Sequence, residues 1–524
     1  MNIGLDFGTT NSILSFYNKS TNYVDTYKLD GNAGANYIPS VVAFDDGDIS
    51  IGEEAKNLTD DEYSKVYSRF KILLNLEDRD RLIAHGYSDK TPQEITAIYL
   101  KELIRKFKFD YRLKKIDNLV LTIPEIWLRD DYISRTILKK IVDDLGLPLK
   151  KFVSEPVSAG AYFLHNYQKA IGKKFNGHLL VFDYGGGTLD VSLLRTQNNR
   201  IKVLERTGIG KGELFCGSAG VAFDERVITT MCQEKTSKLG QNYQVLLNEF
   251  ERKKIQTSGK HEKVIKSYIQ NSSKNKRVFR LTCEDRDNNI LGNFDITASN
   301  LVNAFKDLDK DIKNTLQEIA NKFLKHGVDA NNADKFRVVM VGGFSNFYLS
   351  KRSVKEFFRA DDDDRRFETH FRADDIALAI SKGASLIAED IINIDETYPA
   401  SLDLVVKMMN NRGFAEPKSI NIFRQGDIVT THKVNYINRR ISQAGNLILS
   451  FDNGIKGLSF KIRIDKETHE LYPNFNRLNN RWQIGFSIDK NSFIYVHIRD
   501  KYGDERKTEL GDILNEYSES IIIE

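Results

Sequence analysis

Two short stretches of the chain combine aspartate, glycine and threonine in a pattern suited to phosphate chemistry. In the first, NIGLDFGTTNSILSFY, an apolar run carries Asp6, and Gly8, Thr9 and Thr10 follow before a second β-prone run. An aspartate at the end of a strand is placed to hold a metal ion through water. Glycines in a tight turn let backbone N–H groups approach an anion closely. This stretch therefore predicts a phosphate-binding hairpin.

The second stretch, LLVFDYGGGTLDVSLL at residues 179–194, repeats the pattern. Asp183 ends an apolar run, glycines fill positions 185–187, and Thr188 offers a hydroxyl where a terminal phosphate would lie. Taken alone, this stretch fits a glycine-rich hairpin with solvated aspartates equally well. Two such hairpins in one chain favour a duplicated α/β architecture, in which two phosphate-binding turns face each other across a cleft.

Further segments must position these turns, and their apolar spacing predicts where they lie. Helices are expected over residues 92–109, 129–145, 246–256, 299–326 and 375–389, and strands over residues 119–123, 264–269, 278–282 and 336–343. A hairpin is also expected around the Asp45-Asp46-Gly47 turn. Lys71 lies in RFKILL, a segment that is expected to be helical, and composition alone makes it a surface lysine.

Two sets of charged residues have both a structural and a functional interpretation. Glu155 precedes a proline at a predicted helix start, where it either complements the helix dipole or points into a nucleotide cleft. Glu251, Lys254 and Ser258 are spaced i, i+3 and i+7 on one predicted helical face. That face either carries an ordinary surface ion pair or contacts a ribose and a base edge.

Composition excludes several classes of protein. The 524 residues are 40% hydrophobic and 29% charged, and the net charge of +4 is spread along the chain without a basic cluster of the nucleic-acid-binding kind. The three cysteines are widely spaced and odd in number, which fits a reducing compartment. No signal peptide or apolar run of membrane-spanning length is present, so we expect no membrane association and a cytoplasmic location.

The composition changes after residue 389. Residues 390–402 are short, apolar and interrupted by Pro399, and we interpret them as an interdomain linker. From residue 403 to 510, apolar residues alternate with polar ones between turn residues, a pattern typical of a β-sandwich. Residues 511–524 are interpreted as a tail, since no further helical domain fits there.

Five motifs together give the chain a family resemblance. They are IGLDFGTTNS at 3–12, SEPVSAG at 154–160, FDYGGGTLDVS at 182–192, VGGFS at 341–345 and FSIDKNSFIYVHIRDKYG at 486–503. The chain resembles the heat shock protein 70 (DnaK-type) chaperone family of the actin-like ATPase superfamily. The last motif is similar to the end of that family's peptide-binding β domain, which sugar kinases and filament-forming actin relatives lack.

The resemblance implies a fold and a site. The fold is an actin-like (ribonuclease H-like) duplicated α/β ATPase domain over residues 1–389, followed by the linker, a smaller all-β sandwich and no helical lid. Mg²⁺ would be held through water by Asp6 and Asp183. The residues implied to act in ATP hydrolysis are Lys71, Glu155, Asp183 and Thr188. The residues implied to bind ATP or ADP are Asp6, Gly8, Thr9, Thr10, Asn11, Gly185, Gly186, Gly187, Glu251, Lys254, Ser258, Gly342, Gly343 and Phe344.

The chain departs from the family pattern at three places. The family's GGEDFD segment is AGVAFD at residues 219–224, so one loop on the phosphate side has lost polar residues. Phe344 stands where the family has a serine, and no arginine follows to stack on adenine. Residues 403–485 match poorly, so no peptide-contacting residues are named. The changes at residues 219–224 and at Phe344 predict an altered nucleotide affinity.

The function implied by the resemblance is that of an ATP-hydrolysing, Mg²⁺-dependent chaperone that binds polypeptide through its β domain. Without a lid, peptide release is expected to be fast. The alternatives are an ATP-switched binding protein with one dedicated partner, and a small-molecule kinase or filament-forming ATPase on the same fold. Expected partners are polypeptide clients, a co-chaperone and a nucleotide-exchange factor, and the protein is expected to be a monomer.

Overall fold

The computed structural model divides the chain into two compact units. The first contains residues 1–149 and 153–393, and the second contains residues 150–152 and 394–524. The residues that the structure describes are 1–29, 36–58, 64–128, 132–210, 219–232, 243–284, 290–372, 375–395, 401–409, 415–424, 427, 429, 433–436, 446–452, 458–463, 483–489, 491, 493–499 and 504–512.

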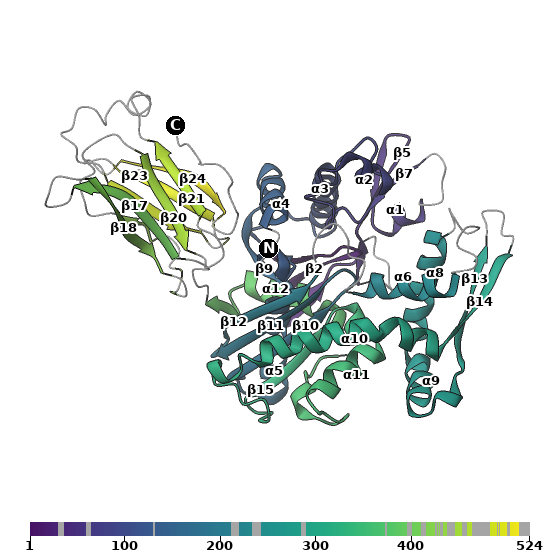
Figure 1. The fold of residues 1–524 in the computed structure, drawn as a ribbon. Coiled ribbons are helices and arrows are strands. Elements are labelled where there is room, and N and C mark those ends of the chain that lie inside the picture. The colour runs from purple at the N-terminus through teal and green to yellow at the C-terminus, as the bar shows by residue number, and fades with distance from the viewer. Residues whose placement is uncertain are drawn as a thin grey trace. The chain divides into compact units, whose positions relative to one another are not determined.

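Two mixed sheets form the centre of the first unit (Figure 1). The first sheet has the order β3-β2-β1-β8-β9, with the short strand β4 (Ile38–Pro39) paired to β2. Its strands are β1 (Asn2–Phe7), β2 (Asn11–Asn18), β3 (Tyr23–Thr26), β8 (Asn118–Ile123) and β9 (Leu149–Ser154). The second sheet has the order β15-β10-β11-β12-β16. Its strands are β10 (Gly177–Tyr184), β11 (Leu189–Gln197), β12 (Arg200–Ile209), β15 (Phe336–Val341) and β16 (Asn393–Asp395).

The two sheets repeat one topology. In the first, β1 pairs antiparallel with β2 and parallel with β8, and in the second, β10 pairs antiparallel with β11 and parallel with β15. A parallel pair requires a crossover connection, whereas a hairpin needs only a tight turn. Both predicted glycine hairpins are therefore confirmed, and each begins its own sheet.

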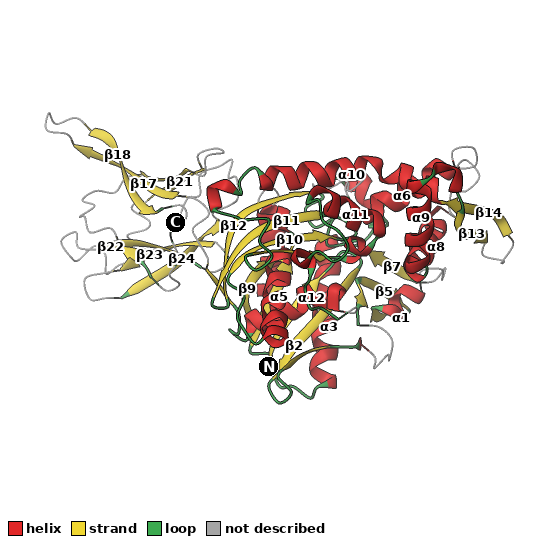
Figure 2. Ribbon diagram, turned by 90° about the horizontal axis from the view of Figure 1, so that it is seen from below, coloured by secondary structure: helices red, strands yellow, loops and turns green. Residues whose placement is uncertain are grey.

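Helices α5 (Glu155–Ile171) and α12 (Asp375–Ala388) pack against each other and against the sheets, α12 on β1 and β2 and α5 on β10 and β11 (Figure 2). Small residues make this contact possible. A Cβ added at Gly383 of α12 would lie 1.7 Å from the carbonyl oxygen of Ser158 in α5, and one added at Gly4 of β1 would lie 2.2 Å from the nitrogen of Ser385. The two helices therefore connect the two sheets through close contacts between backbone atoms.

Long helices cover the outer faces of both sheets. Helix α3 (Pro92–Asp110) begins with a capping box between Thr91 and Glu94, and its Tyr99 and Phe107 rings pack on the first sheet. Helix α4 (Tyr132–Asp144) contacts α3. On the second sheet, α10 (Ala298–Ala320) and α11 (Tyr348–Phe357) close an extensive apolar core.

Smaller elements extend from each half of the first unit. Beside the first sheet lie helices α1 (Glu53–Asn57) and α2 (Arg79–Ala84) and a sheet of β5 (Val41–Asp45), β6 (Asp48–Ile51) and β7 (Lys65–Ser68). The predicted turn at Asp46 and Gly47 is confirmed, since both have positive φ between β5 and β6. The second half carries α6 (Gly220–Cys232), α8 (Tyr243–Gln256), α9 (Ser258–Gln270) and the hairpin of β13 (Arg277–Glu284) and β14 (Ile290–Thr297).

Three predictions of local structure are wrong. Residues 264–269 lie in helix α9 and not in a strand, because Ile265 and its neighbours at i+3 and i+4 pack on the core with helical spacing. The predicted helix over 299–326 ends at Ala320 and continues as turns and a short 3-10 helix, η5 (Leu324–His326). Lys71 lies in a turn after β7, where Arg69 has a φ of 62°, and not in a helix.

The second unit is all β. One four-stranded sheet has the order β18-β17-β20-β21, and its strands are β17 (Ser401–Met409), β18 (Ala415–Phe423), β20 (Asn446–Asp452) and β21 (Leu458–Arg463). The other has the order β19-β22-β23-β24, and its strands are β19 (Asn435–Tyr436), β22 (Gln483–Ile488), β23 (Phe493–Arg499) and β24 (Glu505–Asp512). The predicted strands are confirmed wherever the structure describes them. The first strand begins two residues before 403, and the last passes residue 510.

Candidate functional site

The turns of the two glycine hairpins lie next to each other. A Cβ added at Gly186 would be 3.6 Å from Oγ1 of Thr10, so the two turns are within van der Waals distance. The first turn is fixed by Ser40, whose Oγ donates to the carbonyl of Gly8 at 2.7 Å and whose N–H donates to Thr10 at 2.8 Å. The second is closed by a bond from the N–H of Gly185 to the carbonyl of Thr188 at 3.1 Å. The structure thus brings the predicted phosphate-binding turns together.

Three aspartates lie at the base of these turns. Asp6 is buried at the end of β1, and its Oδ1 accepts a hydrogen bond of 2.9 Å from Thr122 of β8. Asp183 of β10 is paired across the hairpin with Asp190 of β11, so both carboxylates lie on one face of the second sheet. Oδ2 of Asp183 and both carboxylate oxygens of Asp190 are buried without a partner in hydrogen-bond geometry among the described residues.

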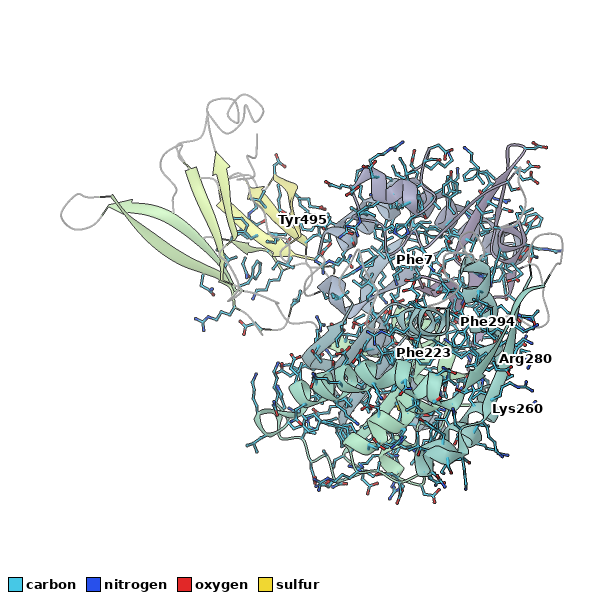
Figure 3. All side chains as sticks on the ribbon, turned by 45° about the vertical axis from the view of Figure 1, so that its right-hand side comes forward. Phe7, Phe223, Lys260, Arg280, Phe294 and Tyr495 are labelled. Carbon is cyan, nitrogen blue, oxygen red and sulfur yellow. The ribbon has the colours of Figure 1, made fainter. Side chains whose placement is uncertain are left out.

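A buried ion pair faces these carboxylates. Nζ of Lys71 lies 2.8 Å from Oε1 of Glu155, the first residue of α5, and the two side chains are 3% and 12% exposed. The ammonium also lies 5.7 Å from the ring centroid of Phe7 and 5.6 Å from that of Trp127, within the range of cation–π attraction. Phe7 is labelled in Figure 3. Lys71 is therefore buried beside these carboxylates, and its assignment to the surface from composition is wrong.

The crowding of acids shifts their proton affinities. Burial and then the charge of Glu155 raise the pKa of Asp6 to about 7, although Lys71 and the hydrogen bond from Thr122 oppose the shift. Burial and then Glu155 also raise the pKa of Asp183 and of Asp190 well above the ordinary value. One lysine thus faces four carboxylates, and burial, reinforced by the charge of Glu155, raises the pKa of all three aspartates.

The glycine pair after β15 closes the site beside Asp183. Gly342 has a φ of 85°, and a Cβ added there would lie 2.4 Å from Oδ1 of Asp183. Only glycine fits this position, because the conformation and the space both exclude a side chain. Gly343 follows at the start of the 3-10 helix η6 (Gly343–Asn346), where an added Cβ would meet nothing within 4 Å. The backbone is therefore open to a ligand here.

The predicted nucleoside side contains a second buried ion pair. Lys254 of α8 donates to both oxygens of Asp224 in α6, at 2.5 and 2.8 Å, and the lysine ammonium lies 5.3 Å from the ring centroid of Phe344. Burial raises the pKa of Asp224 to about 7, although Lys254 opposes the shift. Lys254 thus pairs with Asp224 and not with Glu251, which excludes the simple surface pair expected from the i, i+3 spacing.

Phe344 is 5% exposed and packs in an aromatic cluster with Phe223, labelled in Figure 3, and with Phe347. The cluster reaches the glycine turns through Gly220, whose N–H donates to the carbonyl of Gly185 at 3.2 Å. The residues brought to this continuous region are those of both turns, the acids, Gly342, Phe344 and Lys254. Ser258 begins a separate helix after Thr257, so it does not share one helical face with Glu251 and Lys254, and its side chain lies outside the described residues.

The donor set fits Mg²⁺ and phosphate. Unpartnered carboxylate oxygens of Asp183 and Asp190 offer the oxygen ligands or water acceptors that Mg²⁺ prefers. Within the described part of the chain, no three His, Cys, Asp or Glu side chains are grouped closely enough to enclose a metal directly. The two glycine turns, with Gly186 exposed, leave backbone open for phosphate oxygens. Asp6 lies two residues before Gly8, and Asp183 and Asp190 lie two residues before and two residues after the turn at Gly185–Thr188.

Sequence reasoning missed three residues of this region. Asp190 could have been found, because a hairpin with a short glycine turn places it opposite Asp183. Glu125 is 1% exposed in the 3-10 helix η2 (Glu125–Leu128), accepts from Ser192 at 3.1 Å and lies 2.8 Å from Nε of Arg206. Its position after a proline gave no signal beyond that of a helix start. Asp224 is the third residue. No local pattern identifies it, because its partner Lys254 lies thirty positions later in the sequence.

Comparison with known proteins decides the family. The model of the Hsp70 protein family matches residues 2–393, about three quarters of the chain. The chain belongs to the Hsp70 family. Chaperone protein DnaK of Mycoplasmopsis agalactiae is 32% identical over 206 residues, which is 39% of this chain and 32% of that protein. Chaperone protein DnaK of Metamycoplasma hominis is 30% identical over 240 residues, which is 45% of this chain and 36% of that protein.

Membership of the Hsp70 family confirms the resemblance identified from the motifs. It implies the actin-like ATPase fold, with which the two mixed sheets of the first unit agree, and it implies nucleotide binding. The matches to the two DnaK chaperones span only about a third of those proteins' lengths. Among the described helices, none combines the length and the apolar character needed to cross a membrane.

Proposed function

We propose that this Hsp70-family protein is an ATP-dependent chaperone that hydrolyses ATP in its first unit and thereby controls polypeptide binding by its β unit. The observation that carries the ATPase proposal is the buried Lys71–Glu155 pair, which faces Asp6 and Asp183 beneath two adjoining glycine turns. Phosphoryl transfer depends mainly on positioning and on electrostatic stabilisation, and this arrangement supplies both.

The chain's own residues have distinct roles in this proposal. Backbone N–H groups of the turns at Gly8–Asn11 and Gly186–Thr188 bind the β- and γ-phosphates. Asp6 and Asp183 would hold Mg²⁺ through water, and the ion would neutralise charge on the phosphates. Lys71, held by Glu155 at 2.8 Å, donates to the attacking water or to the charge that develops on the transferred group.

Thr188 and Glu155 complete the catalytic set. The Thr188 hydroxyl lies in the second turn, where a terminal phosphate would be bound, and Glu155 keeps the Lys71 ammonium in place between the aromatic rings of Phe7 and Trp127. Burial of this pair excludes water other than the nucleophile and strengthens each electrostatic contact. The adenosine would lie along Gly342 and Gly343 toward Glu251, Lys254 and Ser258. Phe344 packs beneath this path.

For the β unit, we propose the role of a peptide-binding sandwich joined to the ATPase domain by residues 390–402. Two antiparallel sheets with apolar alternation can bind an extended segment by strand-like hydrogen bonds and apolar pockets. Linkage then requires that ATP change the affinity for a client by the same factor by which the client changes the affinity for ATP. Polypeptide clients and a co-chaperone are the partners that this proposal needs.

The experiment that tests this function is the rate of phosphate release from ATP, measured with and without an unfolded peptide and Mg²⁺. We expect Mg²⁺-dependent turnover that the peptide accelerates. Lys71→Ala should abolish it, whereas Lys65→Ala should not, because Lys65 is 63% exposed in a surface pair with Asp89. If Lys71→Ala still hydrolyses ATP, Lys71 is not a catalytic residue. If the rate of hydrolysis is the same with and without the peptide, the ATPase and the β unit are not coupled.

A further inference from the structure

The first unit contains an open cavity of about 490 Å³ at the end of the second sheet that is far from the glycine turns. It lies between the start of β10, the end of β11, the turn after η5 and the residue before β15. The polar side chains that line it include His178, Arg195, His326, Asp329 and Lys335. Ligand pockets for small molecules have volumes of about 300–1,000 Å³, so the cavity is large enough for one. The proposed ATPase mechanism makes no use of it.

Cross-strand register concentrates positive charge beside this cavity. His178 of β10 pairs with Arg195 of β11, and Arg195 pairs in turn with Lys202 of β12. Directly paired residues lie on the same face of a sheet, so the three side chains form one row. Its cations are Arg195 and Lys202, because burial and the charge of Arg195 lower the pKa of His178. Like charges placed opposite each other destabilise a sheet, and here Arg195 and Lys202 are exposed and directly opposed. An anion on this row would remove that repulsion.

Nearby acids are too few to neutralise these cations. Glu205 is already surrounded by three partners, with Nζ of Lys322 and of Lys325 each at 3.1 Å and Nε2 of His326 at 2.6 Å. Those contacts help to lower the pKa of Glu205 to about 2, against the opposing effect of burial. Asp329 is the one acid among the residues that line the cavity, against two cations, Arg195 and Lys335. The cavity therefore keeps a net positive charge.

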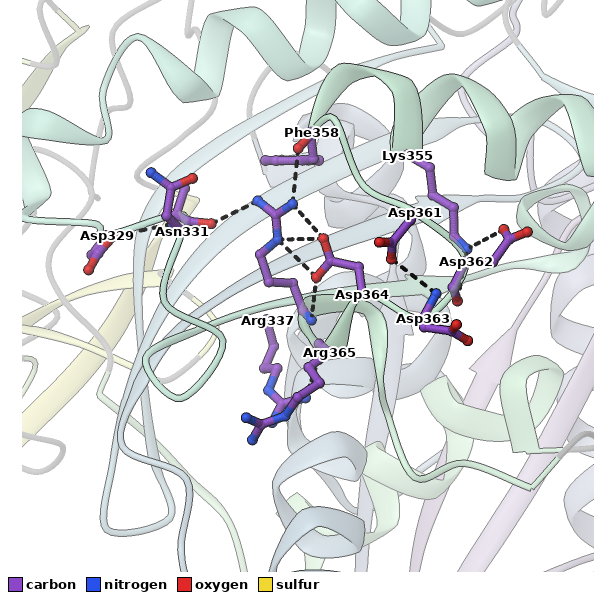
Figure 4. A network of polar contacts seen from close by, with 12 residues as sticks. Asp329, Asn331, Arg337, Lys355, Phe358, Asp361, Asp362, Asp363, Asp364 and Arg365 are labelled. Carbon is purple, nitrogen blue, oxygen red and sulfur yellow. Dashed lines mark hydrogen bonds and ion pairs between the residues drawn. The ribbon is translucent and has the colours of Figure 1, made fainter.

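The segment that follows Asp329 of the cavity wall is held by a polar network (Figure 4). The Arg366 guanidinium donates to the carbonyl of Ala330 at 3.0 Å and is paired with Asp364, which anchors the segment after Asp329. Arg365 donates to Asp334 at 2.9 Å, next to Lys335. Because these contacts hold the backbone on both sides, a ligand would not have to order the site, and preorganisation of this kind favours affinity.

We propose that this cavity binds a small polyanion that carries a di- or triphosphate group. Arg195 and Lys335 are the principal contacts, with His326 at the wall. An arginine fork can bind two phosphate oxygens at once, and a lysine adds a point charge, so the pair suits a phosphate chain better than a single carboxylate. A free polyphosphate and the phosphate tail of a nucleotide share this chemistry.

The cavity is distinct from the proposed ATP site. His178 and Asp183 lie on the same strand, five residues apart, which corresponds to about 17 Å at the rise of an extended strand. Occupancy of one site therefore does not block the other. Failure of this proposal would leave the proposed ATPase function intact.

The test is a titration of the full-length protein, followed by the NMR signals of its histidine rings. His178→Gln and His326→Gln variants assign the two signals among the nine histidines. Inorganic pyrophosphate should shift both signals saturably, and the double variant Arg195→Gln, Lys335→Gln should weaken that binding by at least about tenfold, because it removes both charge-assisted contacts. ADP is titrated in parallel, and the ligand that saturates these signals at lower concentration identifies the source of the phosphate.

A matched control separates this site from general attraction to basic residues. Lys101 is exposed on α3, far along the chain from the cavity, and Lys101→Gln removes one positive charge outside the cavity walls. We expect its pyrophosphate affinity to equal that of the wild type. The proposal is overturned if neither signal shifts saturably, or if the double variant and the Lys101→Gln control bind equally well. The remaining histidine signals report whether each variant is folded.

Discussion

Replacing Asp6 with asparagine should stabilise the nucleotide-free protein, and more so as the pH rises. Asp6 is buried, and its pKa in the folded protein is raised to about 7 by burial and by Glu155. Asparagine cannot ionise, yet its Oδ1 can still accept the hydrogen bond that Thr122 gives to Asp6 at 2.9 Å. The substitution therefore removes a charge with little change in shape.

The magnitude follows from the two pKa values. Between pH 3.8 and about 7 the folded protein keeps a proton on Asp6 that the unfolded chain has lost, so stability falls as the pH rises through this window. Each unit of difference between the folded and unfolded pKa values of Asp6 corresponds to about 1.36 kcal/mol. Above pH 7, the ionisation of Asp6 therefore lowers the free energy of unfolding by about 4 kcal/mol in total. Roughly half of this penalty, about 2 kcal/mol, develops between pH 5.5 and pH 8.

Urea unfolding at these two pH values measures the effect. The chain has two tryptophans, and Trp127 is buried beside Lys71, so its fluorescence in a Trp482→Phe background reports on the first unit. We expect the Asp6→Asn variant to have a higher free energy of unfolding than its parent, and this difference should be about 2 kcal/mol larger at pH 8 than at pH 5.5. Addition of Mg²⁺ and ADP should reduce this advantage, because ligand that binds the folded parent stabilises it.

The result that would refute this reasoning is a stability difference between variant and parent that does not change with pH. Such a result would mean that Asp6 titrates near its ordinary value in the folded protein, and that the acids of the site do not repel one another as the structure requires. A variant that loses stability as the pH rises would contradict the sign of the effect.

Three further predictions concern single residues. Lys71→Ala should abolish ATP hydrolysis and leave ATP binding largely intact, which equilibrium binding and phosphate release measure separately. Gly342→Ala should cost about 1–3 kcal/mol of stability, seen as a lower urea midpoint, because φ is 85° and the new Cβ would lie 2.4 Å from Oδ1 of Asp183. Lys254→Met should cost about 3–5 kcal/mol by the same assay, because it leaves Asp224 buried and unpaired, and the further change Asp224→Leu should recover most of that loss.

Much of the fold could be predicted because its signals are local. Alternation and turn residues marked the strands of the second unit, and repeated Asp-Gly-Thr patterns marked both hairpins of the first. The hairpin register also determines that Asp190 lies opposite Asp183, although this consequence was missed. Where short-range hydrogen bonds and side-chain periodicity fix the conformation, sequence alone was sufficient.

The remaining features depend on contacts between distant parts of the chain. Lys71 and Glu155 are 84 positions apart, so neither the burial of the lysine nor its turn conformation has a local cause. Residues 264–269 contain β-branched residues that favour a strand, but packing of Ile265 against the core selects a helix. The pairing of Lys254 with Asp224 likewise overrides the i, i+3 pairing that a helical surface would favour.

The close contact between α5, α12 and β1 also determines which substitutions the protein can tolerate. Gly4 and Gly383 face backbone atoms at 2.2 and 1.7 Å from an added Cβ, so neither position has room for a methyl group. Gly343, in contrast, borders open space. In a saturation library selected for folding, the first two positions should return glycine alone, while Gly343 should accept many residues. A map of such tolerance would therefore separate the glycines that join the two sheets from the one that leaves room for a ligand.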